Sequence, residues 1–250
     1  MWNGAAVAAR VLSLAIFLVS MSGCDIGVAP PQAAKTATEP PRSQPLELRS
    51  QADAARKRVW FLSRDGVFLH DVGTSRKVAV PLPDWMWVGT DYSCLPDLAL
   101  GPNGEAVITS NILPMLWRID PETLAVSVHP LVLDADADKD VGFSGLVYSS
   151  LHKAFFAVSD LHGSLWRIDP LLRTASKITL SAPIPKACGL TVQPRASQRK
   201  TLRPGGLCAR APGAEWAIDL AADQRSAYVR AASCTDRLAA QLDALLVNGE

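Results

Sequence analysis

Four carboxylates alternate along one short segment, in Asp134-Ala-Asp136-Ala-Asp138-Lys-Asp140. On one face of a strand these charges would repel one another, so the segment is expected to be a loop. Such a loop suits a hard cation, and calcium or another divalent metal is one interpretation. Lys139 stands where an EF-hand loop requires glycine, so a solvated acidic loop without metal is the other interpretation.

Other motifs that would carry a reaction are incomplete. Gly142-Phe-Ser-Gly-Leu146 has leucine where a nucleophile elbow needs its second glycine, and no helical pattern follows it. The sequence also contains no phosphate-binding loop, dinucleotide fingerprint or His-Glu-x-x-His motif. We therefore expect no cofactor apart from a possible metal, and we lean against an enzyme.

An internal repeat positions these residues. Leu116-Trp-Arg-Ile-Asp-Pro121 recurs 49 residues later as Leu165-Trp-Arg-Ile-Asp-Pro170. Aromatic residues precede Asp71 and Asp219 in the same way, at almost the same spacing. Each period contains about four short alternating segments, which is typical of a β-propeller blade. The sequence predicts an all-β propeller over residues 58–230, with about four blades, small or incomplete, and no clear innermost strand in the first.

The repeated residue types have structural explanations. We expect Trp117, Trp166 and Trp216 to pack between neighbouring blades, because one blade cannot bury both faces of its own sheet. The repeated aspartates are expected to accept hydrogen bonds from the backbone of the turn that follows each strand.

Residues 145–170 resemble NHL-type, YVTN-type and gluconolactonase-like propeller repeats. The resemblance implies one ligand-binding face made by the loops that join blades and by those that join second to third strands. The candidate residues on that face are Trp85, Trp87, Tyr92, Asn111, Asp160 and His162. The two tryptophans either stack on a sugar or peptide or anchor their loop.

In gluconolactonase-like enzymes, Asn and Asp residues near the channel hold a divalent metal. Asn111 and Asp160 stand one period apart and fit that pattern, whereas Ser144 stands where an asparagine would be expected. Three functions follow as alternatives: a binding or scaffolding domain for a protein or small molecule, a metal-dependent lactonase or hydrolase, or a truncated, non-functional relative.

The N-terminus has the pattern of an export signal. Residues 1–23 carry one basic residue and a short apolar run, and they end in Ser22-Gly23-Cys24. This ending resembles the lipobox of bacterial lipoproteins, which implies a lipidated Cys24 and attachment to a membrane; an ordinary cleaved signal is the alternative. Residues 24–57 form a proline-rich tether. The expected location is the periplasm-facing cell envelope, with the inner or outer membrane left open.

Four further cysteines, Cys94, Cys188, Cys208 and Cys234, would form two disulfides in an oxidising compartment. Three connectivities are possible, and free thiols are the alternative. Residues 231–250 have a leucine stripe that predicts a C-terminal helix. The net charge of +1 indicates no affinity for nucleic acid.

Overall fold

The computed structural model describes residues 47–89, 94–193, 206–232 and 234. The signal peptide, Cys24, the tether before residue 47, Tyr92 and residues 235–250 of the expected helix lie outside these described residues. No helix within the described ranges has the length and apolar character needed to cross a membrane.

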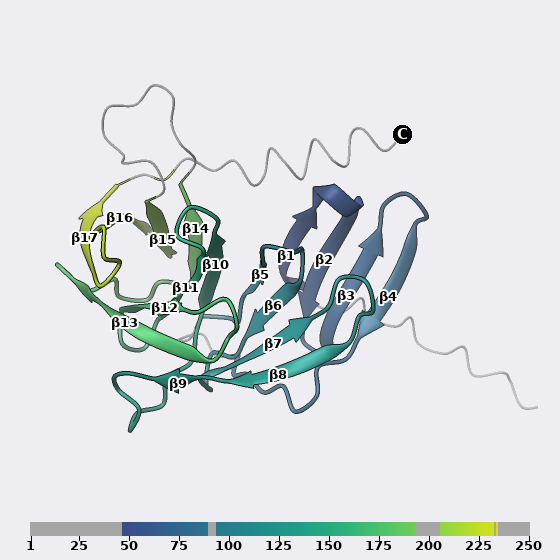
Figure 1. The fold of residues 1–250 in the computed structure, drawn as a ribbon, viewed down its shortest axis with the longest axis horizontal. Coiled ribbons are helices and arrows are strands. Elements are labelled where there is room, and N and C mark those ends of the chain that lie inside the picture. Colours follow the sequence, from purple (N-terminus) through teal and green to yellow (C-terminus); the bar gives the residue numbers. More distant parts are fainter. Residues whose placement is uncertain (1–46, 90–93, 194–205, 233, 235–250) are drawn as a thin grey trace, which may run out of the picture. The chain divides into compact units, whose positions relative to one another are not determined.

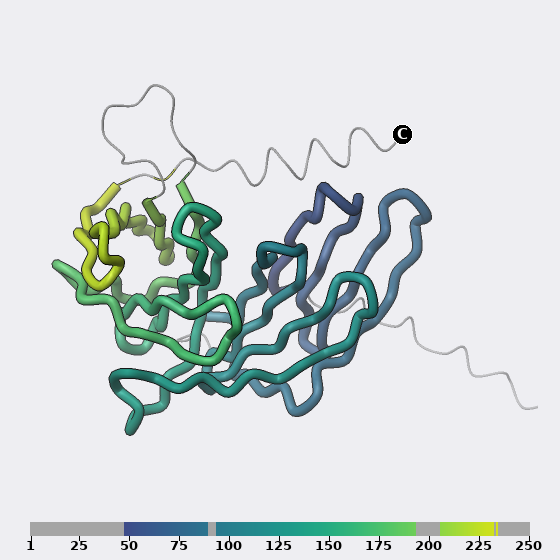
Figure 2. Tube along the Cα trace, viewed as in Figure 1, coloured from purple at the N-terminus to yellow at the C-terminus, as the bar shows by residue number. Residues whose placement is uncertain are grey.

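The strands form four antiparallel meanders that follow one another along the chain (Figures 1 and 2). Blade 1 contains β1 (Glu47–Asp53), β2 (Arg58–Ser63), β3 (Gly66–Asp71) and β4 (Arg76–Val80), and blade 2 contains β5 (Leu98–Leu100), β6 (Ala106–Thr109), β7 (Met115–Ile119) and β8 (Val126–Pro130). Blade 3 contains β10 (Gly145–Ser149), β11 (Ala154–Ser159), β12 (Ser164–Ile168) and β13 (Thr174–Leu180), and blade 4 contains β14 (Gly189–Val192), β15 (Leu207–Ala211), β16 (Ala214–Leu220) and β17 (Ser226–Ala231). The predicted all-β, propeller-like fold is confirmed.

Two parallel pairings connect neighbouring blades at their outer edges. The short strand β9 (Val132–Leu133) pairs with β13, and β13 pairs with β17 through Thr179–Ser226 and Leu180–Ala227. Blades 3 and 4 therefore share one continuous sheet.

The first strand corrects the predicted boundary of the fold. The sequence predicts a tether over residues 24–57 and no clear innermost strand in the first blade, but Glu47–Asp53 forms β1 and pairs with β2 along its length. Its sequence, Glu-Leu-Arg-Ser-Gln-Ala-Asp, lacks the apolar alternation that marks a half-buried strand. Polar residues suit this strand because Arg49 forms an ion pair at the inner edge of the blades.

Three buried clusters join successive blades. One lies between blades 1 and 2, one between blades 2 and 3, and one between blades 3 and 4. Trp117 and Trp166 are fully buried in the first two, each packed against the preceding blade, while Trp216 is partly buried in the third. Within the described ranges, no fourth cluster joins blade 4 to blade 1.

The repeated aspartates cap their turns in three blades. Asp71 accepts from the Thr74 amide at 2.9 Å, Asp120 accepts from the Thr123 amide at 2.8 Å, and Asp169 accepts from the Thr174 amide at 2.6 Å. Asp219 differs, because β16 continues past it and the residue pairs across the sheet with Tyr228. The repeat therefore predicts the capping role correctly in blades 1 to 3 and wrongly in blade 4.

Candidate functional site

The inner strands begin at one end of the blades, which we call the loop face, and an ion pair joins them there. Arg49 Nε lies 3.3 Å from Asp97 Oδ1, and Arg49 Nη2 donates to the carbonyl oxygen of Cys188 at 2.7 Å. Asp97 Oδ2 accepts from the Leu146 amide at 2.9 Å. These contacts connect residues of all four blades at one point.

Asp97 is almost completely buried at this point. Burial raises the pKa of its carboxyl, while Arg49 and the amides of Leu146 and Leu98 oppose that rise. Blades 3 and 4 have glycine where blade 2 has Asp97, and a Cβ atom on Gly145 would lie 3.0 Å from the backbone of Gly189. Glycine therefore allows the inner strands of blades 3 and 4 to approach closely.

Sequence reasoning missed this ion pair. Arg49 fell within the predicted tether, and Asp97 carried no motif. One available signal was the position just before the inner-strand leucine, which holds Asp97 in blade 2 but glycine in blades 3 and 4.

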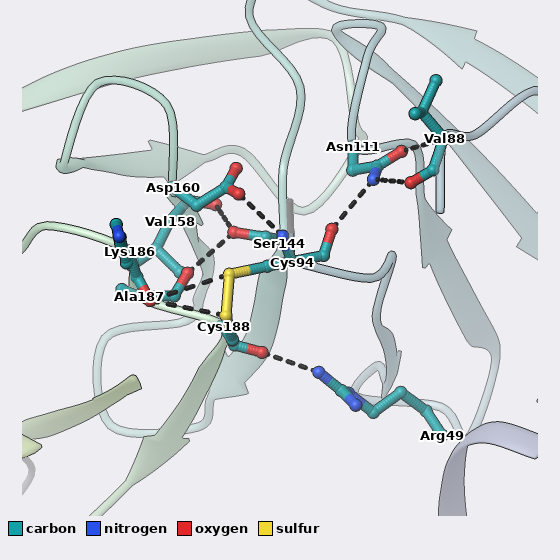
Figure 3. The surroundings of a disulfide bond; sticks show 10 residues. All are labelled: Arg49, Val88, Cys94, Asn111, Ser144, Val158, Asp160, Lys186, Ala187 and Cys188. Carbon is teal, nitrogen blue, oxygen red and sulfur yellow. Dashed lines mark hydrogen bonds between the residues drawn. A yellow bond between two sulfur atoms is a disulfide. The ribbon is translucent and has the colours of Figure 1, made fainter. Parts of the chain in front are cut away.

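A disulfide between Cys94 and Cys188 lies beside Arg49 of this ion pair (Figure 3). It links the segments that lead into β5 and β14, and the two cysteines are 94 residues apart in sequence. The second disulfide joins Cys208 in β15 to Cys234, which follows the end of β17. The predicted pair of disulfides is therefore supported, and the structure selects one of the three connectivities that the sequence left open.

Asn111 and Asp160 hold the Cys94 segment in place. Asn111 Nδ2 donates to the carbonyl oxygens of Cys94 at 2.8 Å and Val88 at 2.7 Å, and its Oδ1 accepts from the Val88 amide. Asp160 Oδ2 accepts from the Cys94 amide at 2.8 Å (Figure 3). The two residues proposed from resemblance as metal ligands are thus brought together, but here both bind backbone. Ser144, the position that departed from the metal pattern, donates to the Ala187 carbonyl oxygen at 2.8 Å.

A hollow of about 570 Å³ adjoins these residues. We call it the loop-face hollow, and it is lined by Val88, Asn111, Ile112, Asp160, Leu161, His162, Gly163, Pro183, Pro185 and Lys186. Leu161 is 72% exposed at its rim, and His162 Nε2 lies 3.4 Å from the carbonyl oxygen of Asp140. Three of the predicted ligand-face residues, Asn111, Asp160 and His162, therefore line one concave surface.

Trp85 and Trp87 lie on the adjoining loop and do not line this hollow. Trp85 Nε1 donates to the Thr109 carbonyl oxygen at 2.9 Å, and Trp87 Nε1 donates to that of Arg64 at 3.4 Å. Their ring centroids are 6.0 Å apart, and both pack against the cluster between blades 1 and 2. The contacts of Trp85 and Trp87 are those of side chains that anchor a loop.

The acidic segment is balanced by lysines. Asp136 pairs with Lys139 at 2.9 Å and also with Lys177, and hydrogen bonds from Lys177 and then Lys139 lower the pKa of Asp136 to about 2. Asp134 accepts from the Lys177 amide at 2.8 Å, while Asp138 and Asp140 are exposed. Among the described residues, no group of three or more His, Cys, Asp or Glu side chains could hold a metal ion. Calcium binding at this loop stays a prediction.

Comparison with known proteins identifies the architecture. No family model and no curated protein matches the chain. Among solved structures, an auxiliary nutrient binding protein from Bacteroides thetaiotaomicron aligns at 10% identity with a TM-score of 0.50, covering 76% of this chain and 43% of that one. Virginiamycin B lyase from Staphylococcus aureus aligns at 13% identity with a TM-score of 0.48, covering 73% of this chain and 54% of that one.

The chain thus spans about half the length of these proteins. The likeness to the nutrient binding protein concerns the fold alone, and it agrees with the four meanders described above. The chain is a protein of the β-propeller type.

Proposed function

We propose that this protein is a lipid-anchored envelope protein whose propeller binds a protein segment or small molecule in the loop-face hollow. The observation that carries the proposal is the convergence of Asn111 and Asp160, from equivalent loops of two blades, on one backbone segment beside a concave surface. These contacts, with the Cys94–Cys188 disulfide, hold the walls of the hollow in place before a ligand arrives, which reduces the entropy lost on binding.

The lining supports binding more than catalysis. Asn111 and Asp160 already bond to the backbone, which leaves His162 and Lys186 as the polar side chains with fewer protein contacts. The remaining walls are mostly apolar, from Val88, Leu161 and two prolines. Apolar walls with a few polar groups are typical of sites that bind small molecules.

The proposed anchor agrees with where the fold begins. Arg49 lies near the start of β1 and donates a hydrogen bond to Cys188 on the loop face. The chain therefore enters the propeller at that face. A proline-rich tether of about 20 residues, at roughly 3 Å per residue, can hold the domain tens of Å from a membrane.

A binding screen of the purified full-length protein against peptide and small-molecule arrays tests the proposal. Leu161→Ser should abolish a genuine signal, because Leu161 is exposed at the rim of the hollow. Leu171→Ser is the matched control, since Leu171 is 57% exposed but lies in the turn between β12 and β13. Signals that survive Leu161→Ser, or no binding at all, would overturn the proposal.

A further inference from the structure

A second concave surface lies at the outer edge of blade 4, on the side of the molecule formed by the β13–β17 pairing. It has a volume of about 540 Å³, within the roughly 300–1,000 Å³ of small-molecule sites. Its polar lining residues are Asp219 and four that bear hydroxyl groups, Thr179, Ser181, Ser226 and Tyr228. None of these residues lines the loop-face hollow.

Asp219 is the repeated aspartate that does not cap its turn. In blade 3 the strand ends at Ile168, and Asp169 accepts hydrogen bonds from the turn. In blade 4 the strand continues to Leu220, which places Asp219 on the face of the sheet. The carboxylate therefore has a different role from that of the three capping aspartates.

Neither oxygen of the Asp219 carboxylate accepts a hydrogen bond from the described residues. Its side chain is 18% exposed, Oδ2 lies 3.6 Å from Arg230 Nε, and Oδ1 is buried with no hydrogen-bond partner. Because Oδ1 is buried, a ligand hydroxyl would donate to Oδ2, which lies beyond hydrogen-bond distance of Arg230. Arg230 offsets part of the negative charge, so the ligand does not need to be a cation.

Tyr228 is the direct cross-strand partner of Asp219, and it is 62% exposed. Paired residues in an antiparallel sheet project from the same face, so an accessible aromatic ring lies beside the carboxylate. An aromatic ring offers an apolar surface for stacking, and neighbouring carboxylate and hydroxyl groups exchange hydrogen bonds with a polar ligand. A neutral sugar matches both features, because it presents C–H groups on one face and hydroxyls around its edge.

We propose that Asp219 and Tyr228 form a binding site for a neutral saccharide at the outer edge of blade 4. Tyr228 stacks on the sugar ring, Asp219 accepts a hydrogen bond from a sugar hydroxyl, and Ser226 and Thr179 contribute to the rim. The site is separate from the loop-face hollow and does not depend on the function proposed for it.

Saturation-transfer NMR and calorimetry on the full chain, with maltose, cellobiose and diacetylchitobiose as probes, test this site. We expect at least one of the sugars to bind, and Tyr228→Ala and Asp219→Asn each to weaken that binding at least tenfold. Tyr228 is largely exposed, so its replacement should leave the fold intact, which a circular dichroism melt checks.

Asp71→Asn is the matched control, since Asp71 is the equivalent aspartate of blade 1 and caps its turn. Leu161→Ser separates the two sites, because it alters only the loop-face hollow. Binding that is lost with Leu161→Ser but kept with Tyr228→Ala would assign the sugar to the hollow and overturn the inference. Absence of binding to all three sugars would overturn it as well.

Discussion

Replacing Asp97 by alanine tests whether the ion pair at the loop face holds the blades together. The substitution leaves Arg49 Nε and the Leu146 amide without their acceptor, while Arg49 Nη2 keeps its hydrogen bond to the Cys188 carbonyl oxygen. Breaking a fully buried pair by removing one partner costs about 3–5 kcal/mol. Asp97 is 8% exposed but Arg49 is 30% exposed and keeps some hydration, so we expect a cost near the lower end, about 3 kcal/mol.

Urea denaturation followed by circular dichroism measures this change in the free energy of unfolding, and it should appear in a thermal melt as a fall of roughly 6–12 °C. Glu122→Ala is the control, because it removes the Arg56–Glu122 pair, in which Glu122 is 66% exposed. Exposed pairs contribute about 0–1 kcal/mol. Equal costs for the two variants would refute the argument that the Arg49–Asp97 pair joins the blades.

Removing the Cys94–Cys188 disulfide by double serine substitution should lower the free energy of unfolding by about 4–5 kcal/mol, since the bond closes a 94-residue segment, and an unchanged urea midpoint would contradict this. Asp136→Asn should reduce the loss of stability between pH 4 and pH 2. The pKa of Asp136 in the folded protein is about 2, below its ordinary value of 3.8. The ionised carboxylate therefore stabilises the fold above pH 4, and this stabilisation is lost as the pH falls. A pH series of thermal melts measures it, and curves of the same shape for both proteins would contradict it. If the acidic loop is a calcium site, equilibrium dialysis should show stoichiometric calcium uptake that Asp136→Asn weakens. Absence of uptake would contradict a calcium site, and Lys139 and Lys177 would then be the only cations that balance Asp136 among the described residues. Cys24→Ser should release the protein from membrane fractions or block its processing; normal processing with full membrane retention would refute lipidation.

The internal repeat carried most of the fold prediction. The six-residue match fixes two adjacent blades, and its spacing locates the weaker outer copies. The sequence did not predict β1, because β1 is mostly polar whereas a typical strand alternates apolar and polar residues. One of these polar residues, Arg49, forms the contacts with Asp97 and Cys188. The sequence motif did not predict the different role of Asp219, because the length of β16 depends on its pairing with β17 and the motif contains no information about that pairing.

For the candidate site, the sequence predicted where residues lie better than it predicted which groups they contact. Asn111, Asp160 and His162 line the loop-face hollow, whereas Trp85 and Trp87, expected on the same face, do not, and a ligand-binding role for all five stays a prediction. The hydrogen-bond partners of Asn111 and Asp160 depend on the path of the loop that carries Val88 and Cys94. The sequence of this loop has no periodic pattern from which its path could be predicted. Disulfide connectivity was unpredictable for the same reason.

The pairing of β13 with β17 has a consequence for how the molecule opens. Blades 3 and 4 share backbone hydrogen bonds as well as a buried cluster, whereas blades 1 and 2 lie in separate sheets and meet through side chains. Cooperative units in native-state hydrogen exchange follow such continuous networks. The amides of blades 3 and 4 should therefore exchange together as a single unit, and those of blade 1 should exchange at a lower free energy of opening.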